Sequence, residues 1–191
     1  MALVMTSGPA LEPVTVAEAK AHLRIDHSAE DVLVSSLILT SRLHIETALG
    51  IALIAQGWTY LRDRWPASAA VSLPLRPLIA VDEIRVHRAD GPPTVVSASE
   101  YAVDAASAEP RVVRQVGSWP APGRATHGIA IDFTAGFGAA AADVPQPIRQ
   151  ALLILTAHWY EHRSTIEIGS DATVVPLGVS ELLMPYRRKR L

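Results

Sequence analysis

Two histidines come closest, by type and spacing, to a catalytic or metal-binding pattern. His158 and His162 are four positions apart in a segment of helical periodicity, so both imidazoles lie on one helix face, where two histidines can bind zinc. Glu161 lies between them, but zinc proteases need the order H-E-x-x-H, with the acid directly after the first histidine. No third ligand stands nearby. We interpret the pair as helix-face packing and keep a histidine-based metalloenzyme as a third hypothesis.

Other catalytic motifs are missing from the sequence. The chain has no cysteine, which excludes thiolate metal sites, a cysteine nucleophile and a disulfide scaffold. It contains no G-x-S-x-G, G-x-x-x-x-G-K or G-x-G-x-x-G motif. Gly136-Phe137-Gly138 follows a predicted strand, as a phosphate loop would, but lacks a third glycine. We interpret it as a hinge or a close backbone contact, and predict no enzyme, no catalytic residue, no cofactor and no metal.

The C-terminus concentrates positive charge in Arg187, Arg188, Lys189 and Arg190. Such a tail can bind nucleic-acid phosphates or an acidic protein surface, or it can simply be a solvated end. Subtracting these four charges from the net charge of -2 leaves -6 for the rest of the chain. This polarity suits docking of one end onto an acidic partner better than gripping DNA along a groove. A nucleic-acid-binding module using the tail is our second hypothesis.

The composition describes a folded chain with little polar surface. Of 191 residues, 49% are hydrophobic and 19% are charged, against about 25% charged in a typical domain. This is enough apolar material for a core and excludes intrinsic disorder. No secretory signal pattern and no run of about 18 apolar residues is present, so we expect an intracellular protein that does not enter a membrane. The shortage of charge indicates burial against partners.

Helical periodicity and end signals predict three to four helices. Thr15 and Glu18 form a capping box, Gly50 is a typical helix stop, and Asp143 is expected to cap the third helix. The expected helices span about 15–24, 28–49 and 146–163, with a short one at 179–184. In the second, Leu33 and Leu43 widen the apolar face beyond one stripe, so this helix is expected to contact neighbours on two sides.

The middle of the chain, residues 57–134, predicts a small antiparallel β-sheet of unknown order. Its prolines preclude long helices, and the alternation of Ile129, Ile131 and Phe133 with smaller or polar residues is typical of a half-buried strand. The expected strands lie at 58–61, 71–73, 82–88, 94–97, 101–103, 111–113 and 129–134. We predict an α+β fold that is mainly α-helical. Residues 1–163 would form one body with the sheet inserted, and 164–191 a C-terminal arm.

An ordered set of short motifs resembles the head–tail connectors, or adaptors, of tailed bacteriophages and gene transfer agents. The motifs run through nearly the whole chain, and their order is more specific than any one of them. They are Glu12-Pro13-Val14-Thr15, Ala17-Glu18-Ala19-Lys20, His22-Leu23-Arg24-Ile25-Asp26, Ile45-Glu46, Gln56-Gly57-Trp58, Asp63-Arg64-Trp65-Pro66, Leu73-Pro74-Leu75-Arg76-Pro77-Leu78, Phe133-Thr134-Ala135-Gly136-Phe137-Gly138, Asp143-Val144-Pro145, His158-Trp159-Tyr160-Glu161-His162-Arg163, Pro176-Leu177-Gly178-Val179, Leu182-Leu183 and Pro185-Tyr186-Arg187.

The resemblance implies a virion structural role. Adaptors of this family form a ring, usually of twelve subunits, under the portal protein of the filled head, and the other face receives the next connector, a stopper or a tail terminator. Double-stranded DNA passes through the channel without sequence-specific binding, and an acidic wall would let it slide. The expected location is the neck of a phage or phage-like particle assembled in the bacterial cytoplasm. The family has no catalytic residues to carry over.

Two surfaces follow from this resemblance as expectations. The C-terminal region 165–191 would face the portal, since the family docks there with its C-terminal helix or arm. Its candidate contacts are Leu182, Leu183, Tyr186, Arg187, Arg188, Lys189 and Arg190. Subunits of a ring meet through two different faces. The candidates for these contacts are Leu33, Leu37 and Leu43 of the second helix.

Overall fold

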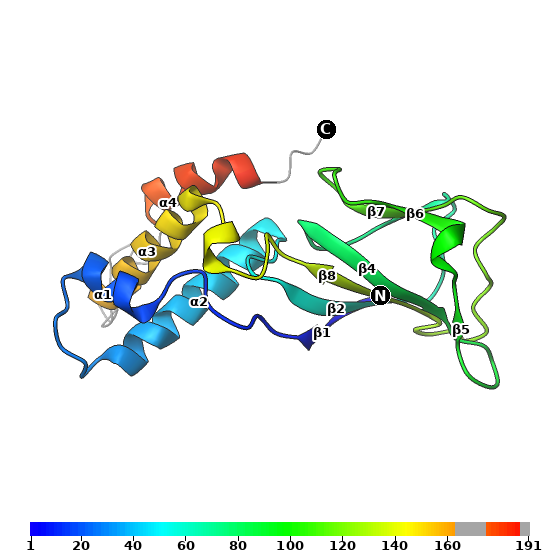
Figure 1. The fold of residues 1–191 in the computed structure, drawn as a ribbon, viewed down its shortest axis with the longest axis horizontal. Helices are drawn as coiled ribbons and strands as arrows, with labels where there is room; N and C mark the ends of the chain where they lie inside the picture. The colour runs from blue at the N-terminus through cyan, green and yellow to red at the C-terminus, as the bar shows by residue number, and fades with distance from the viewer. Residues whose placement is uncertain (163–174, 188–191) are drawn as a thin grey trace, which may run out of the picture. The chain divides into compact units, whose positions relative to one another are not determined.

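The computed structural model describes residues 1–162 and 175–187, and the chain divides into two compact units (Figure 1). The β-rich unit comprises Met1–Ala10 and Gly50–Ala139, and the helical unit comprises Leu11–Leu49 and Ala140–Leu191. Each unit is thus built from two separate stretches of chain. The boundary expected between residues 163 and 164 lies outside the described residues.

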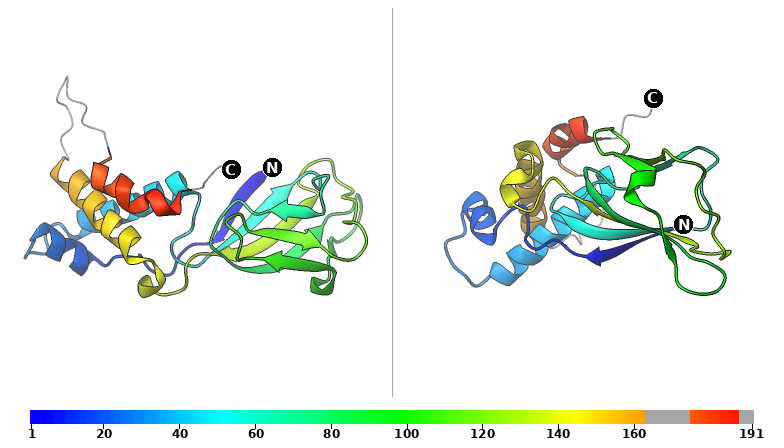
Figure 2. Two further views of the ribbon diagram at one scale, coloured as in Figure 1. Left: turned by 90° about the horizontal axis from the view of Figure 1, so that it is seen from above. Right: turned by 45° about the vertical axis from the view of Figure 1, so that its right-hand side comes forward.

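The helical unit contains all four expected helices. They are α1 (Val16–Leu23), α2 (Asp31–Leu49), α3 (Gln146–Glu161) and α4 (Leu177–Leu183). Helix α3 packs against each of the other three, and α1 also packs against α2 (Figure 2). The buried side chains recur at three- and four-residue spacing, as helical periodicity requires. They include Val34, Ile38, Ile45 and Leu49 of α2, Ile148, Leu152 and Leu155 of α3, and Val179 of α4.

Two of the three predicted helix-end signals are confirmed. The Thr15 hydroxyl accepts from the Glu18 N–H while the Glu18 carboxylate accepts from the Thr15 N–H, so the capping box is complete. Gly50 follows α2 with φ of 62°, the left-handed conformation of a helix stop. The prediction for Asp143 is wrong. Its carboxylate caps a short 3-10 turn (Ala141–Asp143) by accepting from the Ala140 N–H, and α3 begins only after Pro145.

The β-rich unit holds two antiparallel sheets rather than one. The strands are β1 (Ala2–Ser7), β2 (Gln56–Arg62), β3 (Ala70–Ser72), β4 (Leu78–Val86), β5 (Thr94–Val95), β6 (Tyr101–Asp104), β7 (Arg111–Arg114) and β8 (Ile129–Ala135). The five-stranded sheet has the order β1-β2-β8-β4-β5, and the three-stranded sheet the order β3-β7-β6. About a third of the chain is helical and a quarter is strand, so the fold is α+β, but the prediction that it is mainly helical is wrong.

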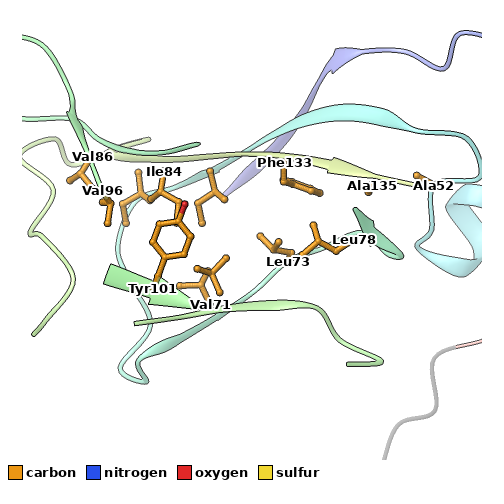
Figure 3. Close-up of a cluster of buried hydrophobic side chains, with 13 residues drawn as sticks. Ala52, Val71, Leu73, Leu78, Ile84, Val86, Val96, Tyr101, Phe133 and Ala135 are labelled. Carbon is orange, nitrogen blue, oxygen red and sulfur yellow. The ribbon is translucent and has the colours of Figure 1, made fainter. Parts of the chain in front are cut away.

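The core of the β-rich unit lies between its two sheets (Figure 3). Ile84 of β4 and Phe133 of β8 face Val71 of β3 and Tyr101 of β6 across this core. The alternation on β8 explains the arrangement, because Ile129, Ile131 and Phe133 are fully buried while Asp132 between them is not. Partly buried rings, including Trp65 and Trp119, pack at the edge of the cluster.

Gly136 marks a close approach of two backbones within this unit. Its φ is +146°, and a Cβ built there would lie 2.6 Å from the Ile54 carbonyl carbon and the Ala55 nitrogen. The N–H of Gly136 donates to the Pro77 carbonyl and that of Phe137 to the Leu53 carbonyl. Of the two interpretations offered for this glycine motif, the structure supports close backbone packing.

Helix α2 is long and apolar enough to cross a membrane by length and composition alone. Packed helices of a folded unit have the same length and composition, and α2 is one of them. It packs against α1 and α3, and it carries the buried charged residues Arg42 and Glu46 at its inner side. Part of its hydropathy is therefore accounted for by packing within the unit, and the rest belongs to exposed side chains such as Val32.

Candidate assembly surfaces

The outer side of α2 carries apolar side chains that the helical unit does not cover. Val32 is 86% exposed, Leu39 42% and Leu43 45%. Their spacing of seven and four residues places them on one helix face, since residues separated by three, four or seven positions stack along a helix. This face lies away from the buried stripe that includes Val34 and Ile38. It is the largest run of exposed apolar side chains on a described helix, and it is available for contact with another chain.

The three leucines expected at a subunit interface divide between two environments. Leu43 belongs to the exposed face, whereas Leu33 and Leu37 are half-buried beside the core. The sequence analysis missed Val32 and Leu39. A signal for them was present, because the spacing 32–39–43 is itself helical, but it was hidden beside the stronger stripe that forms the core.

The inner side of α2 is fixed by a buried ion-pair network. Arg42 Nε donates to Glu12 Oε2 at 2.7 Å, and its Nη1 donates to Glu46 Oε2 at 2.7 Å. Burial alone would lower the pKa of Arg42, but the hydrogen bond to Glu12 and the negative charge of Glu46 raise it above its ordinary value. Nearby, the Ser41 and Thr156 hydroxyls are 3.0 Å apart between α2 and α3. These buried polar contacts set the rotation of α2, and with it the direction of its exposed face.

The N-terminal segment of the helical unit is tied down by a second set of charges. Lys20 Nζ lies 2.6 Å from Asp31 Oδ1, and Arg149 of α3 binds both Glu18 and the Pro13 carbonyl. The hydrogen bond from the Thr15 N–H lowers the pKa of Glu18, with a smaller contribution from Arg149. These contacts hold α1 beside α2 and α3.

The C-terminal candidates occupy different positions in α4 and the turn after it. Leu183 is buried against the unit, Leu182 and Tyr186 are half-buried, and Arg187 is exposed. The remaining candidates, Arg188, Lys189 and Arg190, lie outside the described residues. Beside α4, a hollow of about 140 Å³ is lined by His44, Val175, Leu183 and Arg187, among others.

Two exposed apolar side chains at this end were not singled out from the sequence. Leu177 is 75% exposed and Met184 64%. They are seven residues apart, on the side of α4 away from the buried Val179. Arg187, three residues after Met184, is also exposed, so this end of the chain presents both apolar and cationic side chains.

The histidine pair has the geometry expected from its spacing. The rings of His158 and His162 are 4.4 Å apart between centroids, and His162 Nδ1 lies 2.8 Å from the His158 carbonyl oxygen. Trp159 makes an edge contact with His44 of α2, at 5.6 Å between ring centroids. Among the residues that the structure describes, no group of three or more potential metal ligands occurs. The two histidine rings thus contact each other at the end of α3.

Comparison with known proteins decides the family. A model of the phage gp6-like head–tail connector protein family matches residues 13–110, about half of the chain. The chain belongs to this family. The matched segment includes all of α1 and α2 and the strands from β2 to β6, so the connector signature covers parts of both units.

Solved structures extend the match over the whole connector. A chain in the neck of an empty gene transfer agent particle, computed with C6 symmetry, is 29% identical with a TM-score of 0.86, covering 100% of this chain and 97% of that one. A chain in the virion of a native gene transfer agent particle is 28% identical with a TM-score of 0.86, again covering 100% of this chain and 97% of that one. A chain in the neck of a native gene transfer agent particle, computed with C12 symmetry, is 27% identical with a TM-score of 0.76, covering 98% of this chain and 97% of that one. No curated protein sequence matches.

This connector is therefore a structural protein of the head–tail junction, as the sequence motifs predicted. Several residues of the sequence motifs have a clear role in folding. Thr15 and Glu18 cap a helix, Trp65 binds a backbone carbonyl, and Gly136 permits a close backbone contact. Thr15, Glu18 and Trp65 lie within the family match, and Gly136 lies beyond it.

Proposed function

We propose that this connector forms a ring of twelve subunits beneath the portal, joins the DNA-filled head to the tail, and lets double-stranded DNA pass through its channel. The observation that carries this proposal is the full-length similarity to a neck chain in a particle computed with C12 symmetry. A fold conserved across the whole chain is consistent with conserved contacts on several faces. The proposed location is the particle neck, after assembly in the cytoplasm of the bacterial host.

The subunit contacts would involve the outer side of α2. A ring uses heterologous contacts, in which one face of a subunit meets a different face of its neighbour. Leu43 is exposed and Leu33 and Leu37 are half-buried, which supports a role for this helix. Val32 and Leu39 extend the same surface. Covering these side chains in a ring would also account for the low charged fraction of the chain.

The portal contact would lie at the C-terminal end. Arg187 is exposed, and it opens the run of four cations that ends at Arg190. Leu182, Leu183 and Tyr186 would contribute apolar area, although Leu183 already packs within the helical unit. The opposite face of the ring would receive the next connector, a stopper or a tail terminator. Contact with DNA would be non-specific, because the body outside the tail is acidic and repels phosphates.

The ring proposal is tested by mass. The purified 20.5 kDa chain is measured by mass photometry alone and after mixing with purified portal rings. We expect portal particles to gain twelve times the chain mass, with intermediate species rare. A gain of one or two chains per portal, or no gain at all, would contradict the ring.

The portal contact is tested by neutralising the charges of residues 187–190, because a deletion would be ambiguous. Deleting residues 165–191 would also remove Val179 and Leu183 from the core of the helical unit, so loss of binding would be ambiguous. Replacing the four residues 187–190 by glutamine keeps α4 intact and should weaken portal binding strongly at low salt. The matched control replaces four exposed arginines elsewhere by glutamine, namely Arg24, Arg88, Arg111 and Arg124. Equal binding by both variants would refute a specific role for the tail.

A further inference from the structure

A groove in the β-rich unit has no role in the proposals above. It consists of two hollows, of about 350 Å³ and about 450 Å³, which share Trp65, Pro66 and Ala67 in their walls. The first hollow also includes Arg114 and Trp119, and the second includes Arg62 and Arg64. The two hollows therefore adjoin at Trp65 and are treated together as one groove.

The aromatic wall of the groove is rigid. The rings of Trp65 and Trp119 stack with centroids 4.2 Å apart and planes inclined by 13°. Trp65 Nε1 donates to the Pro120 carbonyl at 2.7 Å, and Trp119 Nε1 donates to the Ala69 carbonyl at 2.9 Å. Both indole N–H groups are therefore satisfied within the unit. What the two rings offer to a ligand is apolar area held in place at low entropic cost.

Three arginines give the groove its charge. Arg62 is held by Tyr60, to whose hydroxyl it donates at 3.0 Å, and Arg64 is exposed with no ion-pair partner among the described residues. The Arg114 side chain is 9% exposed, and its guanidinium lies 5.3 Å from the Trp119 ring centroid. Arg114 Nη1 is 2.7 Å from Glu100 Oε2, but neither this nitrogen nor Nε makes an aligned hydrogen bond. Its positive charge is thus only partly compensated.

The anions near the groove do not cancel this charge. Asp63 is the one carboxylate in its described walls, and its Oδ1 already accepts from the His127 N–H at 2.9 Å. Glu100 adds a second carboxylate beside Arg114. Three guanidinium groups therefore face two engaged carboxylates, on a chain whose net charge is -2. This local excess of positive charge next to an apolar wall is complementary to an acidic ligand with an apolar anchor.

We propose that this groove binds an extended acidic segment of a partner protein, with an aromatic or proline side chain against Trp65 and carboxylates facing Arg62, Arg64 and Arg114. Aromatic-lined grooves bind extended, proline-containing peptides, and arginines select acidic ones. A single strand of nucleic acid suits the groove less well. Such strands need separated aromatic faces for successive bases, whereas Trp65 and Trp119 cover each other. This inference does not depend on the ring.

The experiment selects peptides from a random twelve-residue phage-displayed library on the immobilised full-length chain. Clones that also bind the immobilisation support without the protein are discarded. The peptides that remain are synthesised with a fluorescent label, and their affinities are measured by anisotropy. We expect an acidic consensus containing an aromatic residue or proline, with affinity reduced about ten-fold or more by Arg64→Glu and falling as salt rises. The control, Arg24→Glu, makes the same charge change at an exposed arginine of the helical unit and should bind as the native chain does.

A second substitution tests the aromatic wall. Trp65→Ala should also abolish peptide binding, but this ring packs against the core, so its variant counts only if its circular dichroism and unfolding midpoint are native-like. Arg64→Glu changes an exposed side chain and decides the question by itself. The proposal is overturned if no consensus emerges, if the consensus is neutral or basic, or if Arg64→Glu binds equally well. Binding of a labelled twenty-residue oligothymidine that needs Arg64, without any acidic peptide being selected, would likewise overturn it.

Discussion

Arg42 Nε lies 2.7 Å from Glu12 Oε2, so a residue in the middle of α2 is tied to a residue 30 positions earlier in the chain. The same guanidinium binds Glu46 one turn further along the helix. The Arg42 side chain is 5% exposed and that of Glu46 10%, so both charges are removed from water. Such a network contributes to the choice of one packing arrangement, because a rotated or shifted α2 would leave buried charges unpaired.

Arg42→Met should destabilise the helical unit. The substitution keeps a long apolar side chain but leaves the Glu46 carboxylate buried without its cation, and breaking a buried pair in this way costs about 3 kcal/mol. Urea unfolding of the native and variant chains, followed by circular dichroism, measures the difference in the free energy of unfolding. Arg24→Met, at an exposed position, is the control and should change it by less than about 0.5 kcal/mol. Equal effects of the two would contradict the structural role of the network.

Glu18 should give the chain a defined loss of stability in acid. Its pKa is lowered in the folded chain, chiefly by the hydrogen bond from the Thr15 N–H. A carboxyl with a lowered folded-state pKa stabilises the fold above its unfolded pKa, near 4.5, and this contribution is lost as the pH falls through the lower folded value. Glu18→Gln can retain a capping box but not the charge. Its deficit in unfolding free energy, about 0.5 kcal/mol near pH 7, should therefore shrink below pH 4. A deficit that is constant with pH would refute the assignment.

Gly136→Ala should destabilise the β-rich unit by more than about 2 kcal/mol, because a Cβ would collide with backbone atoms of Ile54 and Ala55 that cannot move independently. Gly117→Ala is a matched control. Gly117 also has a positive φ, +63°, but nothing lies within 4 Å of its added Cβ. Its cost should be limited to about 1 kcal/mol of backbone strain. Thermal unfolding of the two variants separates collision from strain, and equal midpoints would argue against the close contact.

Much of the fold follows from local patterns in the sequence. The capping box at Thr15, the stop at Gly50 and the alternation on β8 each depend on neighbours within a few residues, and each was predicted correctly. Strand β1 was missed because Ala2–Ser7 shows no alternation, and its formation depends on pairing with β2, 50 or more residues away. The division into two sheets likewise depends on long-range pairing. Because these long-range contacts are not visible in local patterns, the chain contains more strand than the sequence analysis predicted.

The candidate surfaces were predictable only in part, for a similar reason. Periodicity shows that α2 has a wide apolar face, but it does not say which side chains the unit itself covers. That depends on the rotation of the helix, which is fixed by Arg42 with Glu12 and by Ser41 with Thr156. No local pattern indicates these partners. As a result the sequence singled out Leu33 and Leu37, which are half-buried, and passed over Val32 and Leu39, which are exposed.

Leu43→Glu should separate folding from assembly. Leu43 is 45% exposed, so a charge there should leave the unfolding midpoint nearly unchanged, whereas burying the same carboxylate in a subunit contact is strongly unfavourable. Leu39→Glu should act in the same way. Ala21→Glu adds an equal charge at an exposed position of α1, outside this face, and serves as the control. Mass photometry with portal rings should show the control assembling normally and the two leucine variants giving incomplete rings or none. Normal rings from both leucine variants would show that α2 faces solvent in the assembled neck, and the subunit contact would then have to lie elsewhere.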